Sequence, residues 1–91
     1  MGQTAKHIIF TGRVQGVGFR YTAFNIANRC ELAGFVRNVP DGTVEMFAQG
    51  PADDVNDCIR DIQEEFAGYL GETKIEDCSP NPKYEDFKIT F

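Results

Sequence analysis

Apolar and polar residues recur along the chain with two different periods, which predict strands and helices in turn. Alternation with a period of two residues is typical of strands that bury one face, and a spacing of three to four residues is typical of amphipathic helices. The predicted strands cover residues 7–11, 35–39, 43–49, 73–78 and 85–91. The predicted helices cover residues 21–32 and the stretch from about 53 to 68.

Turn-forming residues separate these elements. Residues 40–42 (Pro-Asp-Gly) predict a hairpin turn between two strands, and residues 79–82 (Ser-Pro-Asn-Pro) separate the last two strands. In the final strand, Phe87, Ile89 and Phe91 are expected to alternate inward and to hold the end of the chain against the core.

The predicted order is strand, helix, strand, strand, helix, strand, with an extra C-terminal strand. This is the split βαβ pattern of ferredoxin-like α/β sandwiches, which belong to the α+β class, and it predicts an antiparallel sheet with two helices on one face. A chain of 91 residues is long enough for one modest core, so we expect a single domain over residues 1–91. The fold alone does not define a function, because proteins with this architecture sense metabolites, bind RNA or transfer electrons.

The balance of charge disfavours two classes of partner. Nine Lys and Arg residues against 14 Asp and Glu residues give a net charge of −5, which opposes general binding to nucleic acid or to an anionic membrane surface. No apolar run approaches membrane-spanning length, and we expect a cytoplasmic protein. Acidic residues gather on the second predicted helix, where we expect a solvated face. They are Asp53, Asp54, Asp57, Asp61, Glu64 and Glu65.

The cysteines and the single histidine do not have the spacing of a metal site. Cys30, Cys58 and Cys78 are widely separated, without a Cys-x-x-Cys pair, and His7 is the only histidine. We therefore expect no metal site, and reduced thiols as in the cytosol. A disulfide between Cys58 and Cys78 stays open, because the elements that carry them could face each other.

The glycine-rich stretch Gly12-Arg13-Val14-Gln15-Gly16-Val17-Gly18-Phe19-Arg20 joins the first predicted strand to the first predicted helix. In this position a loop can turn several backbone N–H groups toward one point, and the start of the helix adds partial positive charge. The final arginine can add a planar cation that matches phosphate oxygens. Two interpretations stay open: the glycines serve turn geometry alone, or the loop binds an anion. The stretch is not a P-loop and does not fit Gly-x-Gly-x-x-Gly.

Asn38 is a second candidate for a site residue. Alternation places it on the same strand face as Val36, which suggests that this face is partly covered. A buried amide needs hydrogen-bond partners. Asn38 is therefore either a structural hydrogen bonder or a group presented to a ligand.

Two longer motifs resemble the signatures of the acylphosphatase family. Residues 12–20 match Gly-x-Val-Gln-Gly-Val-x-Phe-Arg, and residues 34–38 match Gly-x-Val-x-Asn. Family pairs then follow in order, with Asp-Gly at 41–42, Val-Glu at 44–45 and Gln-Gly at 49–50. The resemblance is dense from about residue 7 to 51, and the order of elements extends it over the whole chain.

The chain departs from the family pattern at two places. Phe35 stands where many relatives have Trp, which is a core substitution that leaves the site alone. Residues 68–72 lack the Gly-Pro pair that often leads into the fourth strand, which leaves the strand register of the last third open.

The resemblance implies a hydrolase that cleaves the carboxyl–phosphate bond of small acyl phosphates to a carboxylate and inorganic phosphate, without a metal or other cofactor. It implies that Arg20 binds the phosphate and that Asn38 positions the attacking water. The implied phosphate-binding residues, mainly through backbone N–H groups, are Gln15, Gly16, Val17, Gly18, Phe19 and Arg20. The expected partners are the acyl phosphate and the phosphate product, with no nucleic acid and no membrane, and we expect a monomer.

A binding module is the alternative to an enzyme. A non-catalytic or accessory phosphate-binding module would share this fold, as the acylphosphatase-like domain of the hydrogenase-maturation carbamoyltransferases does, although those proteins are much longer and carry cysteine-pair zinc motifs. An RNA-binding module of this fold would need exposed aromatic side chains on central strands among basic residues. The acidic balance and the absence of an RNP pattern disfavour it.

Overall fold

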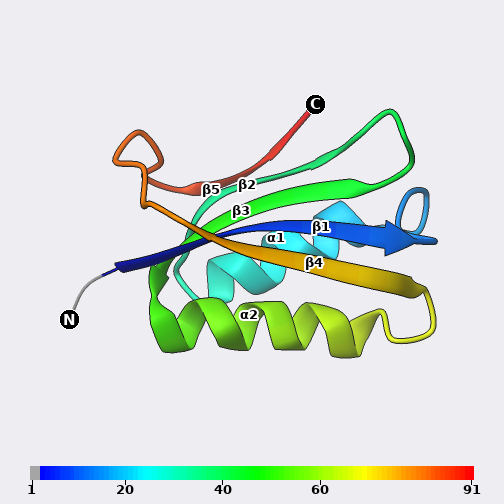
Figure 1. Cartoon of the computed structure of the whole chain (residues 1–91), viewed down its shortest axis with the longest axis horizontal. Coiled ribbons are helices and arrows are strands. Elements are labelled where there is room, and N and C mark those ends of the chain that lie inside the picture. Colours follow the sequence, from blue (N-terminus) through cyan, green and yellow to red (C-terminus); the bar gives the residue numbers. More distant parts are fainter. Residues whose placement is uncertain (1–2) are drawn as a thin grey trace.

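A computed structural model, which describes residues 3–91, has strands and helices in the predicted order (Figure 1). Its strands are β1 (Gln3–Gly12), β2 (Ala33–Asn38), β3 (Val44–Pro51), β4 (Leu70–Cys78) and β5 (Phe87–Thr90). Its helices are α1 (Phe19–Arg29) and α2 (Ala52–Glu65). Both helices pack on one face of the sheet, which confirms the ferredoxin-like α+β fold (Figure 1).

The sheet has the strand order β4-β1-β3-β2-β5, and its last pair differs from the expectation of an antiparallel sheet throughout. β5 runs parallel to β2, so the sheet is mixed. The register explains why. Cys78 at the end of β4 lies beside Ala5, Ala5 beside Gln49, and Gln49 beside Ala33 at the start of β2. β4 therefore ends level with the start of β2. The chain then crosses from the β4 edge of the sheet to the β2 side, so β5 starts beside the start of β2 and runs parallel to it.

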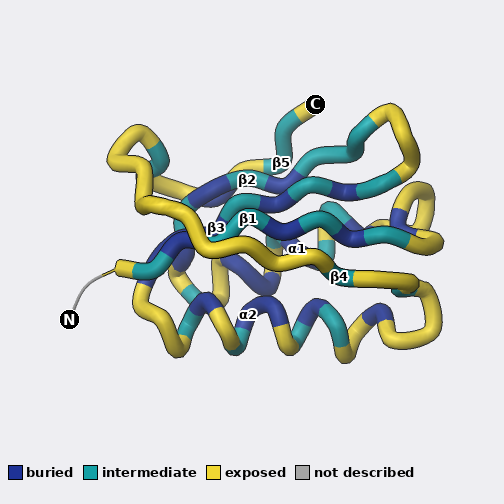
Figure 2. The backbone as a smooth tube through the Cα atoms, in the orientation of Figure 1, coloured by how far each residue is buried: buried dark blue, intermediate teal, exposed yellow. Residues whose placement is uncertain are grey.

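The core lies between the helices and the sheet, where Figure 2 shows the buried positions concentrated. Ile8 and Phe10 of β1 and Val36 of β2 are fully buried on the sheet side, and Ala23 and Ile62 meet them from the helices. Truncating one large side chain in such a core costs about 2–5 kcal/mol. Neither helix is long and apolar enough to cross a membrane.

The three cysteines are free thiols, so the disulfide left open between Cys58 and Cys78 is not formed. Cys58 lies on the buried face of α2, whereas Cys78 is exposed at the end of β4. Burial raises the pKa of the Cys58 thiol to about 12, which keeps it protonated at neutral pH.

A charged group lies on the face of the sheet that the helices leave open. The carboxylate of Glu45 on β3 accepts hydrogen bonds from His7 Nε2 on β1, at 2.7 Å, and from Arg37 Nε on β2. Burial alone would raise the pKa of Glu45, but the hydrogen bonds from His7 and Arg37 outweigh it, and the pKa is lowered. The ionised form of Glu45 therefore stabilises the pairing of three strands.

Glu45→Gln is expected to reduce the free energy of unfolding by about 1–2 kcal/mol at pH 7, because two charge-assisted hydrogen bonds are weakened. A lowered folded-state pKa gives stability above the ordinary carboxyl pKa, and this stability is lost as the pH falls through the lowered value. The difference in the free energy of unfolding between wild type and Glu45→Gln should therefore shrink below about pH 4. Urea unfolding from pH 7 to pH 3 measures it, with Glu72→Gln at an exposed position of β4 as control. A difference that does not change with pH would contradict the assignment.

Candidate active site

The glycine loop between β1 and α1 has a backbone that requires glycine at two positions. Gly16 and Gly18 have φ angles of +80° and +76°, in the left-handed region. A Cβ atom at either position would meet nothing within 4 Å, so backbone conformation, and not space, favours glycine there. Gly18 is also the N-cap of α1, and no side chain caps the first N–H groups of the helix. The loop and the helix start thus offer backbone donors to an anion.

Buried side chains fix both ends of this loop. Val14 and Phe19 are each 1% exposed, while all four residues between them are exposed. The Phe19 ring packs on Phe10 of β1, with centroids 4.9 Å apart, and on Phe66 beyond α2, at 4.6 Å. Because Phe19 is the first residue of α1, its burial sets the position of the next residue, Arg20.

Gln15 fixes the loop to the β2–β3 hairpin. Its side-chain Nε2 donates to the carbonyl oxygens of Val39 and Thr43, both at 2.8 Å. The predicted turn at residues 40–42 is present, closed by a backbone hydrogen bond of 2.9 Å from Val39 N–H to Thr43 O. Sequence reasoning placed Gln15 in the phosphate loop only and missed this second contact, because no local pattern encodes a bond between side chain and backbone across 24 residues.

Asn38, the last residue of β2, lies on the same side of the sheet as the loop. Its Oδ1 is buried and has no hydrogen-bond partner among residues 3–91. An unpaired buried acceptor costs about 1–3 kcal/mol, so a structural role alone does not account for it. Asn38 at the half-buried end of β2 therefore shares a cavity with the loop and carries an amide oxygen without a partner.

A cavity of about 360 Å³ brings most of the predicted site residues together. It is lined by the loop and the start of α1, by Asn38, and by the end of the chain. From the predicted set it contains Gly16, Gly18, Phe19, Arg20 and Asn38. Gln15 does not line this cavity, since its side chain turns to the hairpin, and the exposed Val17 does not line it either.

The C-terminal segment is the part of this cavity that sequence analysis did not assign to the site. Ile89 and Phe91 line it together with Tyr21. The expected inward alternation holds for the buried Phe87 and the half-buried Ile89, but it is wrong for Phe91, which is 97% exposed. Phe91 follows the last residue of β5, so the pleat of the strand no longer directs its side chain inward. Its ring lies against Arg20, whose Cζ is 5.3 Å from the ring centroid.

These contacts define a chemical environment for an anion. The guanidinium of Arg20 and the backbone donors of the loop supply positive charge, and the first turn of α1 contains no acidic residue. The apolar side chains of Tyr21, Ile89 and Phe91 form the remainder of the wall. The described residues 3–91 contain no group of three or more His, Cys, Asp or Glu side chains arranged to hold a metal ion.

The chain is thus a small α+β protein of ferredoxin-like fold, with a glycine loop, a first-turn arginine and a half-buried asparagine around one cavity that is a candidate anion site. The family model for acylphosphatase matches residues 6–89, and the chain belongs to the acylphosphatase family.

Comparisons with individual proteins agree with this assignment. An acylphosphatase of Nostoc sp. is 52% identical over 54 residues, which are 59% of this chain and 54% of the relative. The matched part of this chain therefore spans about half the length of that relative. The crystal structure of acylphosphatase from Bacillus subtilis superposes with a TM-score of 0.88 at 29% identity, covering 97% of this chain and 99% of the other. Full-length HypF in a phosphate- and nucleotide-bound form gives a TM-score of 0.86 at 30% identity, covering 99% of this chain and 12% of HypF.

Gln15→Met should loosen the loop from the hairpin, because methionine has similar length but donates no hydrogen bond. We expect the free energy of unfolding to fall by about 1 kcal/mol, and the backbone amide signals of residues 38–43 to shift in NMR spectra. Gln63→Met on α2, where no side-chain hydrogen bond is lost, is the matched control. Equal behaviour of the two variants would show that Gln15 does not connect the loop to the hairpin.

Proposed function

We propose that the chain hydrolyses the carboxyl–phosphate bond of small acyl phosphates to a carboxylate and inorganic phosphate. One observation supports this most directly: Asn38, whose buried Oδ1 has no hydrogen-bond partner within residues 3–91, lines the same cavity as Arg20 and the glycine loop. A site that only binds phosphate needs cations and N–H donors. An additional buried acceptor is useful when a water molecule must be held beside the phosphate.

Phosphate binding is assigned to Arg20 and to the backbone N–H groups of residues 15–19. The guanidinium matches two phosphate oxygens at once, and the start of α1 adds partial positive charge. Charge on the phosphoryl oxygens is thereby stabilised in the transition state, an effect that is typically worth about 3–4 kcal/mol for each well-placed donor.

Asn38 is assigned the role of positioning the attacking water molecule. Its Oδ1 accepts a hydrogen bond from water, and its Nδ2 donates to a phosphate oxygen, so that the water oxygen faces phosphorus. The new bond forms between water oxygen and phosphorus, the bond from phosphorus to the acyl oxygen breaks, and the carboxylate leaves with the electron pair. The amide is not a base, so the water proton passes to a phosphate oxygen of the substrate.

A metal ion is not required in this proposal. An acyl phosphate already has a good leaving group, so positioning of water and stabilisation of charge are sufficient. The three free thiols support action in a reducing compartment such as the cytoplasm.

An accessory phosphate-binding module is the second candidate, favoured by the likeness to HypF, of which the matched part is only 12%. Such a module would bind phosphate at the same loop and would not release carboxylate from an acyl phosphate. Kinetic measurements separate the two candidates.

Arg20→Gln should lower kcat/KM for a simple acyl phosphate by about 10²–10³-fold and should weaken inhibition by inorganic phosphate. Asn38→Ala should lower kcat by about 10²-fold while the affinity for phosphate stays within about threefold, because Asn38 acts on the water. Arg13→Gln, at an exposed arginine of the same loop that does not line the cavity, is the control and should leave both quantities unchanged.

Turnover by the wild-type chain should also be unaffected by a metal chelator. Phosphate binding without turnover would favour the accessory module. Turnover that the chelator abolishes would contradict the mechanism, and unfolding of Asn38→Ala, seen by circular dichroism, would favour a structural role for that amide.

A further inference from the structure

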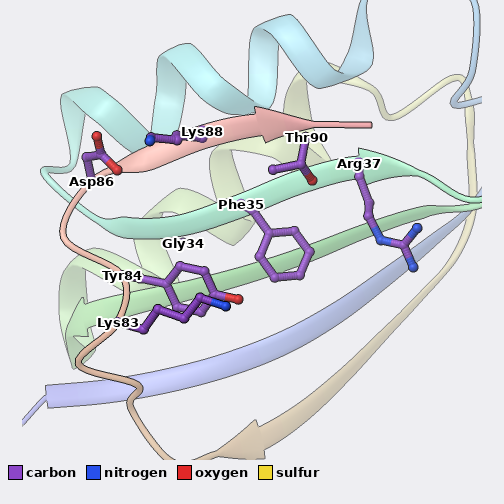
Figure 3. Close-up of a pocket in the computed structure, with 8 residues that line it drawn as sticks. All are labelled: Gly34, Phe35, Arg37, Lys83, Tyr84, Asp86, Lys88 and Thr90. Carbon is purple, nitrogen blue, oxygen red and sulfur yellow. The ribbon is translucent and has the colours of Figure 1, made fainter.

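A second pocket lies on the opposite side of the sheet, on the face without helices (Figure 3). This open-face pocket has a volume of about 440 Å³, within the range of small-molecule sites. Its lining includes Phe35, Arg37, Lys83, Tyr84, Asp86 and Lys88, and it shares no lining residue with the candidate active site.

Half-buried aromatic rings form the floor of this pocket. The ring centroids of Phe35 on β2 and Tyr84 are 5.8 Å apart and tilted by 44°. Phe47, the register partner of Phe35 on β3, packs beside both rings, 6.3 Å from Phe35 and 5.2 Å from Tyr84. In Figure 3 the rings of Phe35 and Tyr84 project to the same side of the sheet. Together they offer an apolar surface wider than one ring.

The loop that carries Tyr84 is fixed to the sheet. Gln49 of β3, which is 5% exposed, donates from Nε2 to the carbonyl oxygens of Asn81, at 2.9 Å, and Tyr84, at 3.2 Å. Its Oε1 accepts from the Asn81 N–H at 2.7 Å. The backbone of Gly34 also donates to Asp86 O at 2.9 Å. A wall held by a buried amide is preformed, as ligand sites generally are.

The charge of this pocket is opposite to that of the whole chain. Lys83 and Lys88 are exposed and form no ion pair within residues 3–91, and the Nζ of Lys83 lies 5.8 Å from the centre of the Tyr84 ring. Arg37 is adjacent, paired with Glu45. Asp86 is the one acidic residue of the lining. Lys83 beside the Tyr84 ring and Lys88 on the β5 side of the lining give this pocket two unpaired cations and an aromatic surface. In a chain of net charge −5, such a pocket attracts a ligand that is both anionic and aromatic.

We propose that the open-face pocket binds a nucleoside monophosphate, with the base against Phe35 and Tyr84 and the phosphate near Lys83 and Lys88. Some RNA-binding domains stack bases on aromatic side chains of a sheet, and here Phe35 of β2 and Tyr84 of the loop before β5 offer an aromatic surface on the open face. A single nucleotide fits better than a strand of RNA, because the unpaired cations of this pocket, Lys83 and Lys88, lie near one edge of the sheet and the chain as a whole repels a polyanion.

An NMR titration of the amide signals with adenosine monophosphate tests this, with excess inorganic phosphate present to occupy the glycine loop. We expect saturable shifts at residues 34–37 and 83–88, with a dissociation constant of about 1 mM or tighter, and no further shifts at residues 14–20. Adenosine and ribose 5-phosphate, which each lack one half of the ligand, should bind at least about tenfold more weakly.

Two variants identify the contacts. Lys88→Gln should weaken binding several-fold. Lys74→Gln should not, because Lys74 lies beside Ile9 of β1 on β4, the opposite edge strand of the sheet. Tyr84→Leu keeps apolar volume but removes the ring, and should weaken binding about tenfold. Absence of binding at 10 mM nucleotide, equal effects of the two lysine variants, or tighter binding of a single-stranded oligonucleotide than of the mononucleotide would each overturn the proposal.

Discussion

Burial of the Phe19 ring between Phe10 and Phe66 is the contact on which the arrangement of the candidate active site depends most. Four exposed residues of the glycine loop would have no fixed position if only the backbone connected them to the fold. Val14 and Phe19 place both ends of the loop in the core, and the cost of exposing such side chains, about 1.5–3 kcal/mol each, keeps them there. Because Phe19 begins α1, the same contact positions the helix start and Arg20.

The sheet then brings the second half of the site to this loop. β3 lies between β1 and β2, so the end of β1 and the end of β2 are separated by one strand, and Gln15 spans that gap by bonding to the hairpin. The alternation of side chains along β2 also separates two environments. Asn38 points to the helix side and its neighbour Arg37 to the open side, which is why two cavities on opposite faces share the same strands and no residues.

Most of the fold could be predicted from local pattern. The element order, the 40–42 turn and the burial of Ile8, Phe10 and Val36 follow from periodicity and turn chemistry. The parallel pairing of β5 could not be predicted in the same way, because it depends on where β4 ends relative to β2. The exposure of Phe91 was missed for a related reason, since alternation does not show at which residue the last strand ends.

The candidate site was predictable in part. The loop, Arg20 and Asn38 came from motifs and from a family resemblance, and the fold places all of them at one cavity. The double hydrogen bond of Gln15, the contribution of Ile89 and Phe91, and the clustering of Phe35, Phe47 and Tyr84 depend on register and on loop geometry. The sequence contains those residues, but no spacing rule brings them together.

In the proposed site the glycine loop and Arg20 hold phosphate beside Asn38, and a titration of the amide NMR signals with inorganic phosphate tests this arrangement. The largest saturable shifts are expected on the backbone amides of residues 15–20 and on the side-chain amide of Asn38, with one dissociation constant that Arg20→Gln weakens. Saturable shifts confined to other residues, such as Lys83 and Lys88 on the open face, with the loop unchanged, would contradict it.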